Sequence, residues 1–362
     1  MTKFNPANER IKRAYFAYLK EANRNGEQSV DAAAKALNRF EVDTKFRDFK
    51  AFHREQAIAF KRHLADQRNA RTKAPLSKAT LHSTLAALKA FFFWLAGQPG
   101  YRSRLTYSDA DYFNLSSKDV AVAKAVREQR VPTIEQIMHV LTVMPTGTDI
   151  ELRNRALVAF TLLTGARDGA IASLRLKHVD LEAEQIGQDA REVHTKFSKT
   201  SCTDFFGVGE EVKAIVTEWV AHLRTEKLWG LDDPLFPATK VEVGPRRHFE
   251  ATGLSRQPWR NASPIRSIFK AAFEAAGLPY FNPHSFRKTL TLLGEDRCES
   301  PEEFKAWSEN LGHDSVLTTF TSYGQLPSHR RHEIMRRLAK PRISSDDMLA
   351  AVREVVNAPN RG

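Results

Sequence analysis

The helical spacing of apolar residues in the first 100 residues is the strongest constraint on the fold. In "LSKATLHSTLAALKAFFFWLAG" (76–97), apolar side chains recur every three or four residues, Ser77 stands where an N-cap is expected, and Gly97 stands at the end. The segment "NPANERIKRAYFAYLKEAN" repeats the spacing behind an Asn5 cap, and so does "FHREQAIAFKRHLADQ". We therefore expect a helical domain over residues 1–100.

The net charge of +12 lies wholly in the first third of the chain. Residues 1–130 contain 25 Lys and Arg against 13 Asp and Glu, whereas residues 131–362 contain 30 of each. A basic module joined to a neutral one indicates that the first part binds a polyanion on which the second part acts. The cations are spread through helical segments and do not form a polybasic tail, which favours nucleic acid over a membrane as the partner.

The two cysteines, Cys202 and Cys298, give neither a disulfide framework nor metal-ligand spacing, which is typical of a reducing compartment. The N-terminal stretch lacks the apolar region of a secretory signal, and the apolar run "AFFFWLA" (90–96) is too short to span a bilayer. We expect a cytoplasmic protein with no membrane partner.

Residues 97–131 lose the helical periodicity and carry Gly, Pro, Ser and Asp clusters, so we expect an interdomain linker over 101–131. A helix then begins at "PTIEQIMHVL", where Thr133 and Gln136 have capping-box spacing. A further helix, "DIELRNRALVAFTLLTGAR", ends with Gly165 as its expected C-cap.

Two short strands are expected after these helices. They are "REVHTKFSK" (191–199) and "TDFFGVG" (203–209), around a tight turn at residues 200–201. The fold class that follows is mainly α with a small β-hairpin or sheet in the second domain.

Four separated segments carry side chains that could act on a phosphodiester. They are "LLTGARDGAIASLRLKHVDL" (162–181), "HTKFSKTS" (194–201), "NPHSFRKTL" (282–290) and "LGHDSVLTTFTSYGQLP" (311–327). Each segment alone is weak evidence for a catalytic site, because an arginine after a helix or a histidine in a loop often has a structural role. Their order is an arginine, a hairpin lysine, His-x-x-Arg, Leu-Gly-His and then a tyrosine. This order resembles that of the tyrosine recombinases, or phage integrase family.

The resemblance implies a role for each matching residue. The phosphate-handling positions are Arg167, His284, Arg287 and His313, and the nucleophile is Tyr323. For the hairpin lysine, which would be the general acid, two positions compete, and we assign Lys199 because it stands at the expected turn. Lys196 would then be a strand residue that contacts backbone phosphate.

The chain departs from the family pattern at two places. Many members carry an acid three positions after the first arginine, where this chain has Ala170, with Asp168 directly after the arginine instead. The spacing from His313 to Tyr323 is ten where nine is common, and Ser322 occupies the usual position. We interpret the second departure as a one-residue insertion.

The resemblance also implies a two-domain, C-shaped DNA clamp. Its parts would be a core-binding domain (1–100), the linker (101–131), a catalytic domain (132–343) and a C-terminal helix (344–362) that docks on a neighbouring subunit. The candidate DNA contacts are Lys78, His82 and Lys89 in the first domain, and Lys196, Arg246 and Arg247 in the second.

The expected activity is site-specific cutting and rejoining of DNA through a 3′-phosphotyrosyl intermediate and a Holliday junction, without metal, ATP or another cofactor. The expected partners are double-stranded DNA carrying a recombination site and a homotetramer of two bound dimers, with room for a directionality or accessory factor. Integrases of phages or mobile elements and resolvases of chromosome dimers both fit. The alternatives are a DNA-relaxing enzyme like type IB topoisomerases, or a catalytically silent DNA-binding member of the family.

Overall fold

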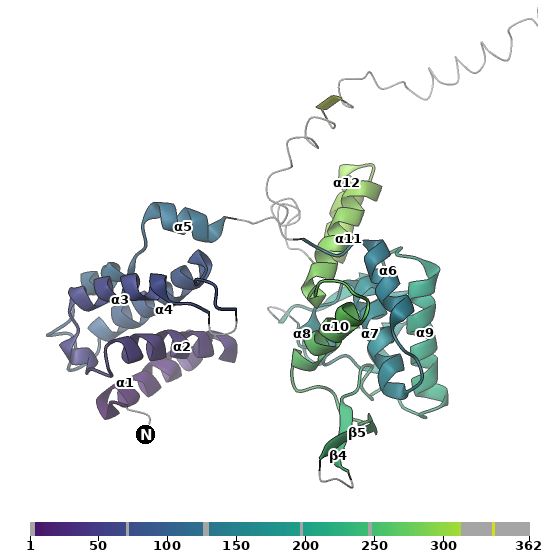
Figure 1. The fold of residues 1–362 in the computed structure, drawn as a ribbon, viewed down its shortest axis with the longest axis horizontal. Coiled ribbons are helices and arrows are strands. Elements are labelled where there is room, and N and C mark those ends of the chain that lie inside the picture. The colour runs from purple at the N-terminus through teal and green to yellow at the C-terminus, as the bar shows by residue number, and fades with distance from the viewer. Residues whose placement is uncertain are drawn as a thin grey trace, which may run out of the picture. The chain divides into compact units, whose positions relative to one another are not determined.

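The computed structural model describes residues 4–69, 72–125, 130–195, 198–244, 248–312 and 335–336. The chain divides into two compact units, Met1–Val126 and Arg127–Gly362. Figure 1 labels the α-helices of both units and the strands β4 and β5. The described part of each is mainly helical, and both small sheets lie in the second unit, which confirms the expected fold class.

The first unit is built from helices alone in its described residues. Asn5 caps its first helix, because the side-chain oxygen accepts hydrogen bonds from the backbone N–H groups of Ala7 and Asn8. The Ser77 cap expected from the sequence is also present. The elements are α1 (Pro6–Ala17), the π-helical turn η1 (Tyr18–Ala22), α2 (Glu27–Asp43), η2 (Phe49–Ala51), α3 (Arg54–Asp66), α4 (Lys78–Ala96), η3 (Tyr107–Phe113) and α5 (Ser117–Lys124).

An aromatic core holds the first unit together. The ring of Phe92 on α4 lies 5.4 Å from that of Phe40 on α2 and 5.1 Å from that of Phe113 on η3. In the part of the chain that is described, α4 is the one helix long and apolar enough to cross a membrane by length and composition. Its apolar side lies in this core, as a central helix of a folded domain requires.

The segment expected as a linker, residues 101–131, forms part of the first unit up to residue 126. The Gly and Pro residues at 97–100 do end the preceding helix α4, but they lie in turns that lead to η3 and do not produce an extended chain. Tyr101, Leu105 and Phe113 are buried in the same core as α4. The first unit therefore extends past residue 100, the boundary expected from the sequence.

The second unit is organised around α7, whose side chains are buried on almost every side. Thr133 and Gln136 form the expected capping box at the start of α6. The elements are α6 (Ile134–Val143), α7 (Asp149–Thr164), α8 (Asp168–Ile171), η4 (Leu176–His178), β1 (Val179–Asp180), β2 (Gln185–Gln188), β3 (Ser201–Asp204), α9 (Glu210–Thr225), β4 (Thr239–Val243), β5 (Phe249–Leu254), α10 (Ser263–Ala275), α11 (Pro283–Arg297) and α12 (Pro301–Asn310).

The strands lie partly outside the segments expected for them. β1, β2 and β3 form an antiparallel sheet in which Ile186 pairs with Thr203, and residues 189–200 are the connection between β2 and β3. Asp189 turns the chain at the start of this connection, because its carbonyl accepts the N–H of Val193 at 2.8 Å. The expected strand over 191–199 is therefore a loop in its described residues. β4 and β5 form a separate ribbon that extends from the helical body (Figure 1).

Helices α11 and α12 pack closely at one point. The indole N–H of Trp307 donates to the carbonyl of Leu290 at 2.9 Å. A Cβ on Gly294 would come within 2.5 Å of that indole nitrogen, so glycine is required for this approach. The contact returns the chain toward the N-terminal half of α11, where His284 and Arg287 are located.

Candidate active site

Arg287 joins three segments of the second unit. Its side chain is 5% exposed, and its Nη1 donates to the carbonyl of Gly165 at 2.5 Å, while its Nη2 donates to the carbonyl of Leu311. The Nε atom is buried and has no hydrogen-bond partner among the described residues. The guanidinium thus holds the end of α7, the start of α11 and the chain after α12 together.

Gly165 makes this junction possible. It has a φ of +59° at the C-cap of α7, a left-handed conformation that glycine adopts without steric cost. A Cβ at this position would lie 3.1 Å from methyl groups of both Leu290 and Leu311. The glycine predicted as a helix cap therefore also serves as a packing point for the other two segments.

Arg167 follows two residues later and is half-buried at the start of α8. Burial lowers the pKa of Arg287 to about 9, and the charge of Arg167 acts in the same direction. Arg287 remains a cation at neutral pH in this setting. The two arginines therefore form a local concentration of positive charge, as a site for a phosphate requires.

His284 lies in the first turn of α11, one turn before Arg287. Although the residue is exposed overall, burial of part of the ring lowers the pKa of His284, and the charges of Arg287, Lys288 and Arg167 lower it further. Asp168 opposes this shift. The neutral imidazole is thereby favoured, which is the form that can accept a proton.

Asp168, the acid next to Arg167 in the sequence, forms an ion pair with Arg266. Its Oδ2 accepts a 2.7 Å hydrogen bond from Nε of Arg266 on α10, and its Oδ1 accepts the N–H of Gly169. Ala170 is 2% exposed and lies in the core. The acid therefore ties α8 to α10, and the position where many family members carry an acid is filled by an apolar contact.

Lys199 is exposed in the connection between β2 and β3. It lies directly after Ser198, whose φ of 51° is uncommon for a residue other than glycine, and two residues before β3. Thr200 closes the base of this connection, because its hydroxyl accepts the N–H of Ala190 at 3.1 Å. The lysine is thus presented on a loop whose ends are fixed by the sheet.

Several expected site residues fall outside the described part of the chain. They are the proposed nucleophile Tyr323, His313, Lys196, Arg246 and Arg247, together with the C-terminal helix expected over 344–362. Gly312 is the last described residue before His313, and its neighbour Leu311 is fixed by Arg287.

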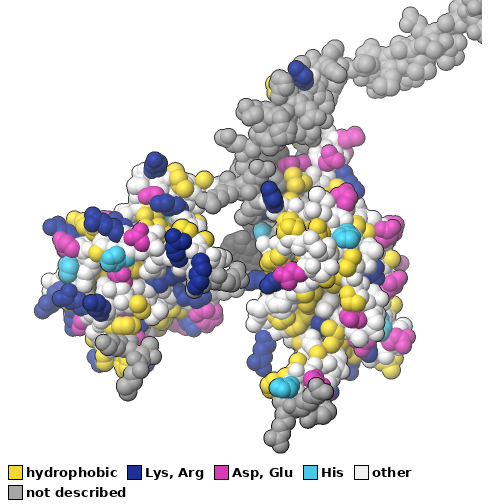
Figure 2. Space-filling view, in the orientation of Figure 1, with side chains coloured by type: hydrophobic (Ala, Val, Ile, Leu, Met, Phe, Trp, Pro, Cys, Tyr) yellow, Lys and Arg dark blue, Asp and Glu magenta, His cyan; other side chains and the backbone are white. Residues whose placement is uncertain are grey.

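The candidate DNA contacts on α4 are engaged within the first unit. Lys78 forms a 2.7 Å ion pair with Asp119 on α5, and Lys89 forms a 2.8 Å ion pair with Asp111 on η3. His82 is half-buried on the same helix. The side of α4 expected to be open is therefore bordered by η3 and α5. Figure 2 shows many other Lys and Arg side chains over the visible face of this unit.

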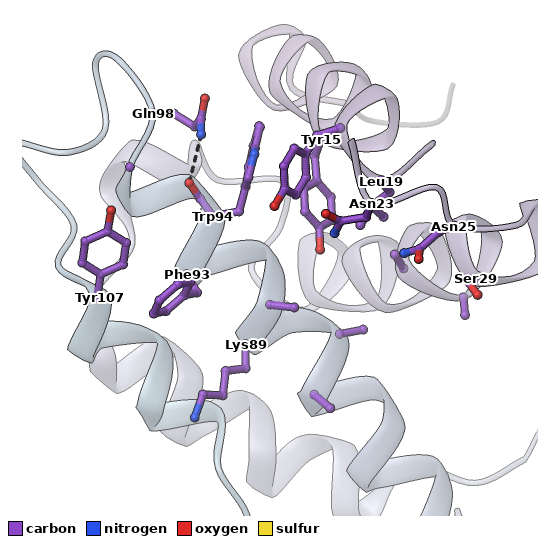
Figure 3. A pocket seen from close by; sticks show the side chains of 17 residues that line it. Tyr15, Leu19, Asn23, Asn25, Ser29, Lys89, Phe93, Trp94, Gln98 and Tyr107 are labelled. Atoms are coloured by element: carbon purple, nitrogen blue, oxygen red, sulfur yellow. Dashed lines mark hydrogen bonds between the residues drawn. The ribbon is translucent and has the colours of Figure 1, made fainter. Parts of the chain in front are cut away.

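A groove of about 930 Å³ lies in the first unit, between α4, α2 and the end of the first helical segment. Phe93 and Tyr107 stand at one end with ring centroids 4.7 Å apart, and Lys89 stands at the edge (Figure 3). Among the expected catalytic residues that the structure describes, none lines this groove. The lining residues that are described all belong to the first unit.

Sequence reasoning missed the two carbonyl acceptors of Arg287 and the Asp168–Arg266 pair. Backbone carbonyls have no sequence signature, and Arg266 is separated from Asp168 by 98 positions. Within the described residues, no group of three or more His, Cys, Asp or Glu side chains could hold a metal ion.

Comparison with known proteins identifies this set of segments. The model of the phage integrase family matches residues 130–329, which is more than half of the chain and includes all four motif segments. The chain belongs to the phage integrase family.

Relatives of this phage integrase family member include curated recombinases. The tyrosine recombinase XerC of Lactobacillus delbrueckii subsp. bulgaricus (strain ATCC BAA-365 / Lb-18) is 26% identical over 253 residues, which cover 68% of this chain and 72% of the relative. The XerC of Lactobacillus leichmannii has the same identity and coverage.

Solved structures of family members share the fold. A lambda integrase dimer bound to a COC′ core site matches with a TM-score of 0.58 at 12% identity, covering 88% of this chain and 97% of that one. The Tn1549 transposon integrase in complex with transposon right end DNA matches with a TM-score of 0.56 at 14% identity, covering 91% and 99%. At these identities, the likeness establishes the fold alone.

Proposed function

We propose that this phage integrase family member is a site-specific DNA recombinase that cuts and rejoins strands through a 3′-phosphotyrosyl intermediate. The observation that carries the proposal is the junction at Arg287, which brings the segments of Arg167, His284 and Leu311 to one place. These segments are far apart in the chain, and they are the ones whose motifs match the family. Their convergence supports a single phosphate-handling site.

The proposed chemistry assigns one task to each group. Ionising a free tyrosine at pH 7 costs roughly 4 kcal/mol, and two arginines beside the phosphate can offset this cost by stabilising charge in the transition state. In the proposal, neutral His284 accepts the proton of the Tyr323 phenol as its oxygen attacks phosphorus. Lys199 gives a proton to the departing 5′-oxygen, and His313 donates a hydrogen bond to a non-bridging oxygen.

The covalent intermediate makes the reaction independent of ATP. The phosphotyrosyl bond retains the energy of the broken phosphodiester, so the 5′-hydroxyl of another strand can attack it and release the tyrosine. Strand exchange then passes through a Holliday junction. The proposed assembly is a homotetramer of two dimers on double-stranded DNA, in the cytoplasm at the nucleoid. The lambda integrase relative, described as a dimer bound to a core site, supports the paired arrangement.

Incubation of the purified protein with supercoiled plasmid in EDTA, followed by an SDS quench, tests this function. We expect relaxed plasmid and SDS-stable protein–DNA complexes, both absent with Tyr323→Phe and retained with Tyr280→Phe, a control at a 43% exposed tyrosine. Relaxation that persists with Tyr323→Phe would place the nucleophile elsewhere.

Two alternatives give different results in the same series. A DNA-relaxing enzyme of the type IB kind would relax plasmid but would not join two duplexes that carry the mapped cleavage site. A silent DNA-binding member would shift the mobility of DNA without forming any covalent complex.

A further inference from the structure

We infer that Ser173 is a positioning residue for Lys199, holding the loop that carries this lysine at a fixed place beside Arg167. The inference rests on the proposed function, because it assigns Lys199 the role of proton donor. Ser173 lies in the first of the four motif segments, 162–181, but the family pattern assigns it no role there.

The Ser173 hydroxyl makes two hydrogen bonds that complement each other. Its O–H donates to the carbonyl of Ala170 at 3.0 Å, and its oxygen accepts the backbone N–H of His194 at 2.9 Å. Both the donor and an acceptor position of the hydroxyl are used, and the side chain is half-buried. One side chain therefore joins the chain after α8 to the connection between β2 and β3.

This link acts between the two catalytic segments. α8 begins at Asp168, directly after Arg167, so the carbonyl of Ala170 is fixed relative to that arginine. The loop also approaches α8 at Gly169, where an added Cβ would lie 3.9 Å from the carbonyl oxygen of His194. Ser173 thus sets the distance between the helix that follows Arg167 and the loop that carries Lys199.

Other contacts fix the loop to different elements. Nε2 of His178 on η4 lies 2.9 Å from Oε2 of Glu192, and Thr200 closes the base of the loop with Ala190. Neither contact involves α8. The hydrogen bond to His194 therefore supplies a connection to the Arg167 segment that these contacts do not provide.

Lys199 is located between two fixed points, His194 at the Ser173 hydroxyl and Ser201 at the start of β3. When a loop loses one fixed point, it samples more conformations, and a catalytic group on it spends less time in the reactive geometry. In the proposed step, the bond between phosphorus and the 5′-oxygen breaks as the tyrosyl bond forms. The proton of Lys199 must reach that oxygen at the same time.

The experiment uses the full chain and compares three variants. Ser173→Ala removes the hydroxyl, Ser173→Thr keeps one, and Ser267→Ala is the control. The Ser267 hydroxyl donates to the carbonyl of Ser263 within its own helix, at 3.2 Å. Amide hydrogen exchange without DNA reports the loop directly. We expect faster exchange in peptides covering residues 189–195 for Ser173→Ala, and wild-type exchange for the other two variants.

The second readout is single-turnover cleavage of a duplex carrying the position mapped by SDS trapping, with oxygen or sulfur as the bridging 5′ atom. A thiolate leaves without protonation, so the sulfur duplex does not need the proton of Lys199. We expect Ser173→Ala to slow cleavage of the oxygen duplex about tenfold, the scale of one lost hydrogen bond in a positioning network, and to leave the sulfur duplex unaffected. Ser173→Thr should restore the rate.

Two results would overturn the inference. Equal slowing on both duplexes would mean that Ser173 supports the phosphate pocket or the fold and does not act through the proton donor. Wild-type rates on both duplexes would mean that the loop needs no such link. If the wild-type protein forms no covalent complex with DNA, the proposed function itself is contradicted. Covalent complex formation by the wild-type protein is therefore measured before any variant is compared.

Discussion

The guanidinium of Arg287 donates to the carbonyl oxygen of Gly165 at 2.5 Å, across 122 positions of the chain. The side chain that the family pattern assigns to phosphate is thus also a buried structural tie. Among the described residues, backbone carbonyls and no carboxylate accept its hydrogen bonds, which keeps the positive charge available to an anion.

Replacing Arg287 with methionine should strongly destabilise the second unit. The variant leaves the carbonyls of Gly165 and Leu311 buried without their donor, and such losses sum to about 3 kcal/mol in the free energy of unfolding. Arg266→Met is the control, because its exposed ion pair with Asp168 contributes about 1 kcal/mol or less. Urea unfolding of both variants measures the difference, and equal losses would contradict the structural role of Arg287.

Replacing Gly165 with alanine should lower the free energy of unfolding by about 1–2 kcal/mol, because a side chain is strained at its φ of +59°. The new methyl group would also press against Leu290 and Leu311, which belong to the two segments that meet Gly165 at the site. We expect slower formation of the covalent DNA complex as well. Gly187→Ala on β2, where an added Cβ meets nothing within 4 Å, should leave both measurements near wild type.

The sequence predicted local features of the fold and missed the long-range contacts of the site. The Asn5, Ser77 and Thr133 caps are confirmed, because capping depends on neighbouring residues alone. The strand expected over 191–199 is wrong in its described residues, since the β-forming residues there follow a turn at Asp189 and do not pair. A turn set by backbone carbonyls has little sequence signal.

The same limit applies to the linker and to Arg287. Glycine, proline and aspartate predicted a break after residue 100, but buried Phe113 on η3 keeps that segment in the first unit. Arginine in a His-x-x-Arg motif was predicted to contact phosphate, and nothing in the sequence indicated which backbone groups it would bind. These features depend on tertiary contacts between distant segments.

His284 should make the protein less stable as the pH falls below about 6.5. Its pKa is lower in the folded protein than its ordinary value of 6.5, so the unfolded chain binds the proton first and protonation favours unfolding. The contribution of His284 to stability is therefore complete above pH 6.5. It is lost as the pH falls from 6.5 through the lower pKa of the folded protein.

Thermal unfolding of wild type, His284→Gln and His139→Gln between pH 7.5 and about 5 checks this expectation. His139 is an exposed histidine on α6 and serves as the control. His284→Gln should flatten the acidic decline, whereas His139→Gln should follow wild type. An unchanged decline with His284→Gln would contradict the lowered pKa.

The ion pairs on α4 predict opposite effects of their two partners on DNA affinity. If Lys78 and Lys89 contact phosphate, the carboxylates of Asp119 and Asp111 compete with the DNA for them. Asp111→Asn with Asp119→Asn should therefore tighten binding.

Lys78→Ala with Lys89→Ala should weaken binding and reduce the slope of log affinity against log salt by about 2. Fluorescence anisotropy with a duplex over a salt series measures both quantities. Unchanged slopes in both double variants would assign these lysines to the internal structure of the first unit.

The segment of chain that contains α11 and α12 begins and ends at contacts of one side chain, that of Arg287. The chain leaves Arg287, runs along α11, turns before α12 and comes back to Arg287 at Leu311, with Trp307 fastened to Leu290 on the way. Because both ends of this path are fixed, we expect that the turn between the two helices at residues 298–300 can change in length without moving the site. Insertions or deletions in that turn would then leave the geometry of the candidate active site unchanged.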